Sequence, residues 1–334
     1  FGAATSLKIP YNMEYNFDFQ RELARDLTLT ASYVGSESRH LFIQPMYNAP
    51  LPQNMGPGPV APRTPFPFFG QFPWDSNSGV SSYNSLQAKL QKRFSKGLVF
   101  LASYTWQKCL SIQDEGQSGS IQNPYNWSAD KGNCDFNVPQ IFVFSYAYEL
   151  PFGKGKAFGN DMSGAANALL GGWQISGITT VETGSYFSAT ANATDVANIN
   201  PSSETERANV TGVSPSAGWH QTVQDWYNPA AFTTPAPYTF GDVGRNTLRG
   251  PDTIDWDFGL MKNFHISESK QFQFRAESFN MFNRANFAPP GGGSSGGFAT
   301  LGGAAGTAVN GANFMHIFSA AAAREIQFSL KFLW

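Results

Sequence analysis

The glycine-rich stretch at residues 291–296 is the first place where residue types and spacing could do chemistry. Its sequence, GGGSSG, fits both the GxGxxG pattern of dinucleotide-binding loops and the GxSxG pattern of serine hydrolases. Both patterns need a preceding strand and a following helix to aim their backbone groups. Here Pro289 and Pro290 precede the stretch and a Gly/Ala-rich segment follows it. The context therefore predicts a flexible loop.

The four histidines are the next candidates, as proton carriers or metal ligands. They are His40, His220, His265 and His316. They are dispersed, and no pair has the i, i+4 spacing that places two ligands on one face of a helix. No nucleophile, base and acid can be combined from the sequence either. We therefore expect no enzymatic activity, no metal and no cofactor.

The chain has two cysteines, Cys109 and Cys134, at the borders of one predicted long loop. In an oxidising compartment such a pair fits a loop-closing disulfide, and two unpaired thiols or a metal pair are the alternatives. Closing this loop would stabilise the fold by roughly 3 kcal/mol in the chain-entropy model. Carboxylates in the same region could attract a cation, but scattered carboxylates are usually only solvated. They are Asp114, Glu115, Asp130 and Asp135.

Aromatic residues gather in the segments that are richest in proline and polar residues. Exposed rings there could stack on sugars or grip a peptide, or they could only pack one loop onto another. The candidates for ligand contact are Trp74, Trp219, Trp226 and Tyr227. A further group lies just before Trp74 and comprises Phe66, Phe68, Phe69 and Phe72.

Strands must position these residues, because apolar side chains recur at every second position through most of the chain. Ile326, Phe328, Leu330, Phe332 and Trp334, for example, share one face, and Lys331 lies on the other. The pattern predicts nine strands near residues 12–20, 27–34, 83–94, 98–107, 139–150, 173–182, 254–265, 271–282 and 324–334. Lys262 interrupts the apolar face of the seventh strand.

Composition limits what these strands can form. Charged residues make up 14% of the 334 residues and aromatic residues 15%, whereas about 25% of residues are charged in ordinary soluble domains. The net charge of −2 disfavours a nucleic-acid partner. The longest apolar runs fall short of the ~20 residues that a membrane helix needs. The composition favours strands with one strongly apolar face.

The connections between the predicted strands alternate between short and long. Residues 21–26, 95–97, 151–172 and 266–270 form the shorter set, and residues 35–82, 108–138, 183–253 and 283–323 the longer set. This alternation is typical of outer-membrane barrels, which have short periplasmic turns and long extracellular loops. Aromatic residues near the strand ends would form the interfacial girdles. They are Phe94, Trp106, Tyr148, Trp173, Trp256, Phe264 and Trp334. A soluble sandwich or propeller, the alternative, would have loops of comparable length.

The expected fold is therefore all-β, a transmembrane antiparallel β-barrel. Closed bacterial barrels have even strand numbers, so nine strands indicate the C-terminal part of a larger barrel, with residues 1–334 as one partial barrel domain. The chain starts at Phe1 without a leader, and we expect Trp334 to be a true C-terminus. The polar strand faces would line the lumen, with Gln87, Lys89, Gln91, Gln271, Gln273, Arg275 and Glu277 as candidates.

Several stretches resemble Oar-like TonB-dependent outer-membrane transporters. They are Tyr83–Phe94 with Ala102–Trp106, Asp135–Gln140, Tyr148–Gly155, Gly171–Gly177, Trp226–Phe232, Gly241–Pro251 and Phe274–Asn283. The resemblance implies a 22-stranded barrel with an N-terminal plug. Neither the plug nor a TonB box is recognisable in this sequence. The face formed by Phe328, Leu330, Phe332 and Trp334 is similar to the signal that the barrel-assembly machinery reads.

The resemblance implies a transporter in the outer membrane of a Gram-negative bacterium. Its extracellular loops and plug would bind an unknown ligand, either a carbohydrate, a peptide or a chelate. Its further partners would be outer-membrane lipid, lipopolysaccharide and the TonB complex, the last through the missing N-terminal region. Two alternatives stay open, an outer-membrane adhesion or secretion barrel and a secreted soluble β-rich binding protein.

Overall fold

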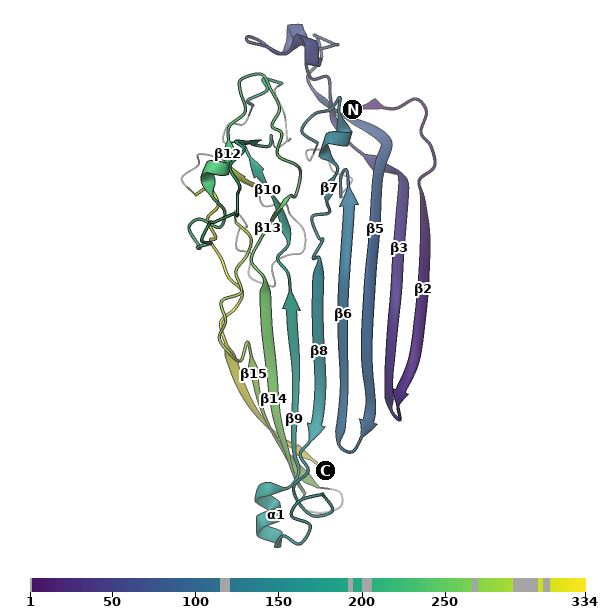
Figure 1. Cartoon of the computed structure of the whole chain (residues 1–334), viewed down its shortest axis with the longest axis vertical. Helices are drawn as coiled ribbons and strands as arrows, with labels where there is room; N and C mark the ends of the chain where they lie inside the picture. The colour runs from purple at the N-terminus through teal and green to yellow at the C-terminus, as the bar shows by residue number, and fades with distance from the viewer. Residues whose placement is uncertain are drawn as a thin grey trace.

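Nine long strands form one antiparallel sheet in which each strand pairs with the next one along the chain (Figure 1). The computed structural model describes residues 2–114, 121–191, 195–199, 206–265, 270–290, 306–308 and 313–334. The nine strands are β2 (Tyr11–Ala24), β3 (Leu27–Ile43), β5 (Phe72–Ser95), β6 (Leu98–Ser111), β8 (Gln140–Glu149), β9 (Trp173–Glu182), β14 (Thr253–His265), β15 (Gln271–Phe279) and β17 (Glu325–Leu333). The sequence pattern predicts this all-β antiparallel arrangement correctly.

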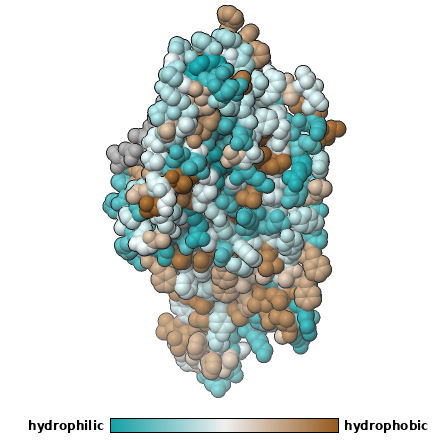
Figure 2. All heavy atoms as spheres, turned by 45° about the horizontal axis from the view of Figure 1, so that its top comes forward, coloured by the Kyte–Doolittle hydropathy of each residue, from teal (hydrophilic) through white to brown (hydrophobic). Residues whose placement is uncertain are grey.

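The register of the sheet separates the two kinds of side chain onto its two faces. Leu86 lies opposite Tyr33 on one neighbouring strand and Trp106 on the other, whereas Gln87 lies opposite Ser32 and Thr105. At the other side of the sheet, Phe272 is paired with Phe264 and Phe332. Because side chains alternate along each strand, these pairings extend into one apolar face and one polar face. Figure 2 shows hydrophobic residues gathered over the lower part of the molecule and hydrophilic residues over the upper part.

Short and long connections lie at opposite ends of the sheet (Figure 1). Lys96 and Gly97 join β5 to β6, and both have positive φ, as a type I′ hairpin turn requires. The connection between β8 and β9 is longer and contains a helix that the sequence pattern did not predict, α1 (Gly164–Leu170). Ser163 caps this helix, its hydroxyl accepting from the amide of Ala166 at 3.3 Å.

Several strands continue beyond the predicted bounds at the long-connection end. β5 begins at Phe72 instead of residue 83 and pairs there with two short strands, β1 (Gly2–Ala3) and β4 (Met46–Tyr47). Phe72 and Trp74, predicted to lie in a loop, therefore belong to a strand. Residues 75–82 lack the apolar alternation on which the prediction relied. β15, in contrast, ends at Phe279, three residues before its predicted end.

The long connections carry most of the remaining elements. They contain the 3-10 helices η1 (Pro52–Asn54), η2 (Ala61–Arg63), η3 (Trp127–Asp130) and η4 (Pro229–Ala231). They also contain the short strands β7 (Gly132–Asn133), β10 (Tyr186–Thr190), β11 (Asn209–Val210), β12 (Phe232–Thr233), β13 (Leu248–Arg249) and β16 (Gly306–Ala308). Among the described residues, no helix has the length and apolar character needed to cross a membrane.

The sheet is open at both sides in the described part of the chain. β2 pairs only with β3, and β17 pairs only with β15. All fourteen residues of β2 are exposed. A row of unpaired backbone groups on such an edge is available for pairing with further strands.

Candidate functional site

Most of the buried hydrophobic residues that the structure describes lie in the long connections and at the adjoining ends of the strands. Their largest cluster joins β10, β12, β13 and neighbouring segments, and consists of Phe187, Ala189, Ala208, Ala231, Phe232, Val243, Leu248, Phe314 and Met315. Two smaller clusters are built around Ile43 and Ile199. The long connections therefore form one packed unit, which we call the loop body, comprising the described parts of residues 44–71, 112–139, 183–252 and 280–324.

Arg245 links two of these connections through a buried guanidinium. It is 5% exposed, and its Nη2 donates to the carbonyl oxygen of Ser111 at 3.0 Å. Its Nε donates to the carbonyl oxygen of Asp130 at 3.0 Å. Nη1 lies 3.3 Å from carboxylate oxygens of both Asp114 and Asp135. Every part of the guanidinium is thus paired, as a buried charge requires.

Arg207 makes a second link of the same kind. Its Nη1 forms a buried ion pair with Asp130, and its Nε donates to the carbonyl oxygen of Val243 at 2.7 Å. Its backbone amide donates to the side chain of Gln122 at 2.8 Å. Gln122 in turn donates to the carbonyl oxygen of Gly241 at 2.9 Å. The two arginines and Gln122 fasten the β9–β14 connection to the β6–β8 connection.

Burial raises the pKa of three carboxyl groups in the loop body. It raises the pKa of Asp130 despite the opposing effect of Arg207. It also raises the pKa of Asp135, and the neighbouring carboxylate of Asp114 adds to this effect. The pKa of Glu206 is raised by burial as well, although two backbone amides, from Val196 and Ala197, stabilise its charge. Burial raises the pKa of Tyr125 to about 12.

Cys109 and Cys134 are joined by a disulfide, with their Cα atoms 5.4 Å apart. The amide of Cys134 also donates to the carbonyl oxygen of Cys109 at 3.1 Å. Cys109 lies in β6, near its end, and β7 pairs with the same end of that strand. The disulfide thus closes the β6–β8 connection at its base, below the two arginine links.

The aromatic side chains proposed for ligand contact make contacts within the loop body or, for Trp74, beside it in β5. Trp226 and Tyr227 pack against the largest cluster, and both donate to the carbonyl oxygen of Arg249, at 2.9 and 3.1 Å. Trp219 donates to the carbonyl oxygen of Asp225 at 3.0 Å. Trp74 is half-buried in β5, with its ring 5.1 Å from that of Tyr47. Their role in binding a ligand stays a prediction.

A group of exposed phenylalanines lies in the β3–β5 connection. Phe66, Phe68 and Phe69 are 48%, 98% and 66% exposed. The backbone around them is held by Asn48, which is fully buried and donates to the carbonyl oxygens of Phe66 and Phe69 at 3.0 and 2.9 Å. The apolar tip is therefore preformed, and we call these three residues the phenylalanine tip.

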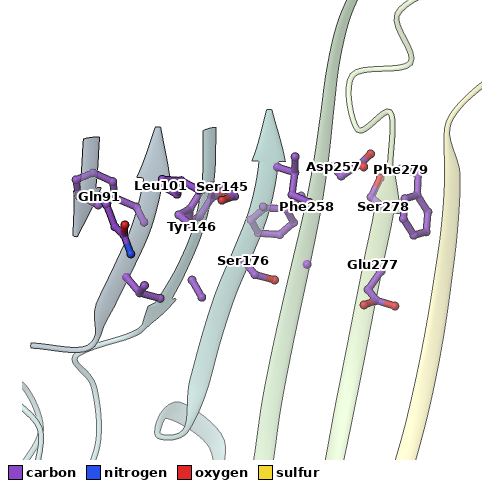
Figure 3. A pocket seen from close by; sticks show the side chains of 16 residues that line it. Gln91, Leu101, Ser145, Tyr146, Ser176, Asp257, Phe258, Glu277, Ser278 and Phe279 are labelled. Atoms are coloured by element: carbon purple, nitrogen blue, oxygen red, sulfur yellow. The ribbon is translucent and has the colours of Figure 1, made fainter. Parts of the chain in front are cut away.

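The residues predicted to line the lumen all lie on the polar face of the sheet. Gln87, Lys89 and Gln91 are on β5, and Gln271, Gln273, Arg275 and Glu277 on β15, with four strands between them. The structure brings Gln91 and Glu277 to the border of one open hollow of about 510 Å³, which crosses β5, β6, β8, β9, β14 and β15 (Figure 3). Ser145, Ser176 and Asp257 lie between them. Glu277 accepts a hydrogen bond from Gln327 of β17 at 2.7 Å.

The remaining candidates from the sequence do not assemble into a site. Residues 291–296 and Glu115 lie outside the described residues, as does the side chain of His265. Asp114, Asp130 and Asp135 are held by arginine in the loop body. In the part of the chain that the structure describes, no group of three or more His, Cys, Asp or Glu could hold a metal ion.

Sequence reasoning missed the residues that organise the loop body, Arg207 and Arg245. Both occur close to other charged residues, Arg207 beside Glu206 and Arg245 near Asp242 and Arg249, so the sequence does not single them out. The partners are remote in sequence, 77 positions from Arg207 to Asp130 and 131 from Arg245 to Asp114. No local spacing could have indicated these pairs.

The family of the chain follows from a comparison with protein-family models. The model described as "Outer membrane beta barrel domain" matches residues 1–327, nearly the whole length. The chain belongs to this family. It is therefore a β-barrel protein of the Gram-negative outer membrane, and the apolar face of the sheet meets lipid. The long connections are extracellular and the short ones periplasmic. A secreted soluble protein is excluded by this family membership.

Solved structures with a similar fold are outer-membrane proteins. The transporter YddB of Escherichia coli has a TM-score of 0.47 and 11% identity, and the match covers 99% of this chain and 34% of that chain. The pyoverdine receptor FpvA of Pseudomonas aeruginosa has a TM-score of 0.43 and 9% identity, over 98% of this chain and 30% of that chain. The chain thus spans about a third of the length of these structures. No curated protein matches the sequence.

Proposed function

We propose that the chain is the C-terminal barrel portion of an Oar-like TonB-dependent transporter. In this proposal a larger barrel encloses an N-terminal plug, and the extracellular loop body contributes to binding a carbohydrate, peptide or chelate. The polar face, including Gln87, Lys89, Gln91, Gln271, Gln273, Arg275 and Glu277, lines the path or contacts the plug.

The observation that carries the proposal is the open sheet. Nine strands are enough to close a small barrel, since eight-stranded barrels exist. Yet β2 and β17 do not pair with each other, and each has a free edge among the described residues. An unpaired edge in lipid leaves backbone groups that cost several kcal/mol each. Further strands that close a wider barrel remove this cost and provide space for a plug.

The loop body supports a binding role at the extracellular end. Its connections are fastened to one another by two buried arginines and a disulfide. A preformed surface loses less conformational entropy on binding than a set of free loops does. The acidic and amide side chains at the hollow of Figure 3, among them Glu277, Asp257 and Gln91, provide polar contacts along the inner wall.

The test is binding of the full-length protein to the periplasmic domain of TonB. Full-length protein, purified from outer membranes in detergent, should bind that domain in the micromolar range by calorimetry. A variant without the N-terminal TonB box should lose binding and keep its heat-modifiable migration on gels. Full-length protein that lacks any plug, or that does not bind TonB, contradicts the proposal.

An adhesion barrel is the second candidate, favoured by the phenylalanine tip. Large exposed apolar patches commonly mark interaction sites, and Phe68 is almost fully exposed. Replacing Phe66, Phe68 and Phe69 together by serine should reduce attachment of cells to a surface or to each other at least fivefold if adhesion is the function. Unchanged attachment at equal surface expression contradicts adhesion.

A further inference from the structure

The periplasmic connection between β8 and β9 folds back onto the membrane-facing side of the barrel. Lys262 of β14 lies on the apolar face of the sheet, between Leu260 and Phe264, which point to the same side. Its Nζ donates to the carbonyl oxygens of Leu169, at 3.1 Å, and Gly171, at the end of α1. The indole of Trp173 donates to the same carbonyl of Leu169 at 2.9 Å. These bonds hold α1 against the outer surface, at the end of the sheet where the C-terminus lies (Figure 1).

Lys262 is buried in this arrangement, with 2% of its surface exposed. Its Nζ lies 4.8 Å from the ring centre of Trp173 and 4.9 Å from that of Phe264. A lysine on a lipid-facing surface is costly unless its charge finds polar partners. The last carbonyls of a helix have no partner within the helix, so Lys262 and the end of α1 satisfy each other.

An apolar hollow of about 500 Å³ lies between this connection and the barrel wall. It is lined by Leu150, Phe152, Met162, Leu170, Trp173 and Leu260. Trp173 and Leu260 belong to the apolar faces of β9 and β14, so the hollow is continuous with the surface that meets lipid. Leu170 is 54% exposed and Leu169, beside it in α1, is 70% exposed. In water, these side chains would form an exposed apolar patch.

We propose that this hollow binds one acyl chain of a phospholipid from the periplasmic leaflet of the outer membrane. Its six lining residues are apolar, which suits a hydrocarbon chain, and its continuity with the lipid-facing surface gives the chain a direct entrance. The connection also carries the exposed cation Lys154, which complements an anionic headgroup, whereas Lys156 is already paired with Glu149 at 2.7 Å. The binding site requires only that the barrel lies in the membrane, and it is independent of transport.

Photo-crosslinking in nanodiscs tests the site. The full-length protein is reconstituted in phosphatidylethanolamine and phosphatidylglycerol that carry a diazirine on the acyl chain, and the labelled peptides are identified by mass spectrometry. In the wild type, we expect labelling within residues 150–173 to exceed labelling of the lipid-facing β5 segment, residues 86–90. Leu260→Trp fills the hollow and should reduce labelling of residues 150–173 at least fivefold.

Leu90→Trp is the matched control, because it makes the same substitution on the apolar face of β5, away from the hollow. It should leave labelling of residues 150–173 unchanged. Leu170 lies outside the sheet, so Leu170→Asp tests the site independently if the Leu260→Trp variant does not assemble. Leu170→Asp should reduce the labelling of residues 150–173 by the same factor. Equal labelling in wild type, Leu260→Trp and Leu170→Asp overturns the proposal.

Discussion

Individual charged residues, more than apolar ones, determine how the extracellular connections are joined. Arg245 and Arg207 are each buried and each paired with carboxylates and backbone carbonyls of the β6–β8 connection, and Arg245 also with the last residue of β6. Burying a guanidinium is costly unless its hydrogen bonds are satisfied, so each arginine tolerates only one arrangement of its neighbours. The arginines therefore specify one conformation of the loop body.

Replacing Arg245 by methionine should loosen the loop body without affecting the barrel. The change leaves Asp114 and Asp135 without their cation, and breaking a buried ion pair costs about 3–5 kcal/mol. Hydrogen exchange in residues 121–138 and 206–249 should become faster, whereas exchange in β6 and β14 should be unchanged. Arg249→Met is the control, because the Arg249–Asp252 pair is exposed and long, at 3.8 Å. If residues 121–138 and 206–249 exchange as slowly in the Arg245 variant as in the wild type, Arg245 is dispensable for the loop body.

Mild acid should not open the loop body. Burial raises the pKa of Asp130, Asp135 and Glu206 above their ordinary values. A carboxyl group with a raised pKa binds its proton more tightly in the folded state, so the free energy of unfolding rises as the pH falls toward that pKa. Limited proteolysis of the loops should therefore be no faster at pH 5 than at pH 7.5. Faster cleavage at pH 5 would contradict this expectation, because it would mean that the ionised forms of these carboxylates stabilise the loop body more than the protonated forms do.

At the scale of elements, the β8–β9 connection differs from an ordinary periplasmic turn. The turn between β5 and β6 needs only Lys96 and Gly97, whereas the β8–β9 connection contains a capped helix with its own contacts to the barrel wall. Asn167 strengthens it, because its side chain accepts from the amide of Lys154 at 2.8 Å. The connection is therefore a structured element on the membrane side of the rim.

Replacing Lys262 by methionine should release α1 from the barrel wall. Methionine suits the lipid-facing surface, but it donates no hydrogen bond to the carbonyls of Leu169 and Gly171. Hydrogen exchange in residues 164–171 should become at least tenfold faster, and the heat-modifiable migration of the barrel should persist. Lys331→Met, on the polar face of β17, is the matched control and should leave α1 unchanged. A protected helix in the Lys262 variant would contradict this role.

Removing Trp334 should impair assembly of the barrel into the outer membrane. Trp334 is 86% exposed and stacks on Phe332, which in turn contacts Phe272 of β15. Its ring adds little to the fold itself, so its main role is expected in recognition by the assembly machinery, together with Phe328, Leu330 and Phe332. The measurement is the amount of heat-modifiable protein in outer-membrane fractions. Trp219 replaced by alanine, far from the C-terminus, serves as the control and should assemble normally.

At the scale of the whole molecule, the open sheet is the dominant feature. Both faces of β2 are exposed along its full length, and most of β17 is exposed as well. The apolar face can be covered by lipid, but an unpaired strand edge cannot be satisfied there. The stable molecule is therefore expected to contain more strands than these nine.

Residues 1–334 produced alone should consequently fail to form a monomeric barrel. Refolded in detergent, this segment should form oligomers through its free edges or stay unfolded, whereas the full-length protein should give a heat-modifiable monomer. Size-exclusion chromatography with light scattering distinguishes the two. A monodisperse, heat-modifiable monomer of the segment would show that nine strands close without additional ones.

The sequence by itself determined the strands, their order and the two faces of the sheet. The period of two is a local property, and alternating residues such as Leu86 and Gln87 or Phe272 and Gln273 establish it without any knowledge of distant contacts. The bounds were less accurate at the extracellular end, where Phe72 and Trp74 lie in a strand extension. Lipid does not impose apolar alternation on that part of the chain.

Only the tertiary structure decided how the functional end is built. The links from Arg245 to Asp114 and from Arg207 to Asp130 join residues far apart in the chain. The same holds for Lys262 and the end of α1, 91 to 93 positions away. Irregular connections have no period from which contacts can be predicted. Their arrangement follows from the requirement that each buried charge finds its partners, which is met only in the assembled fold.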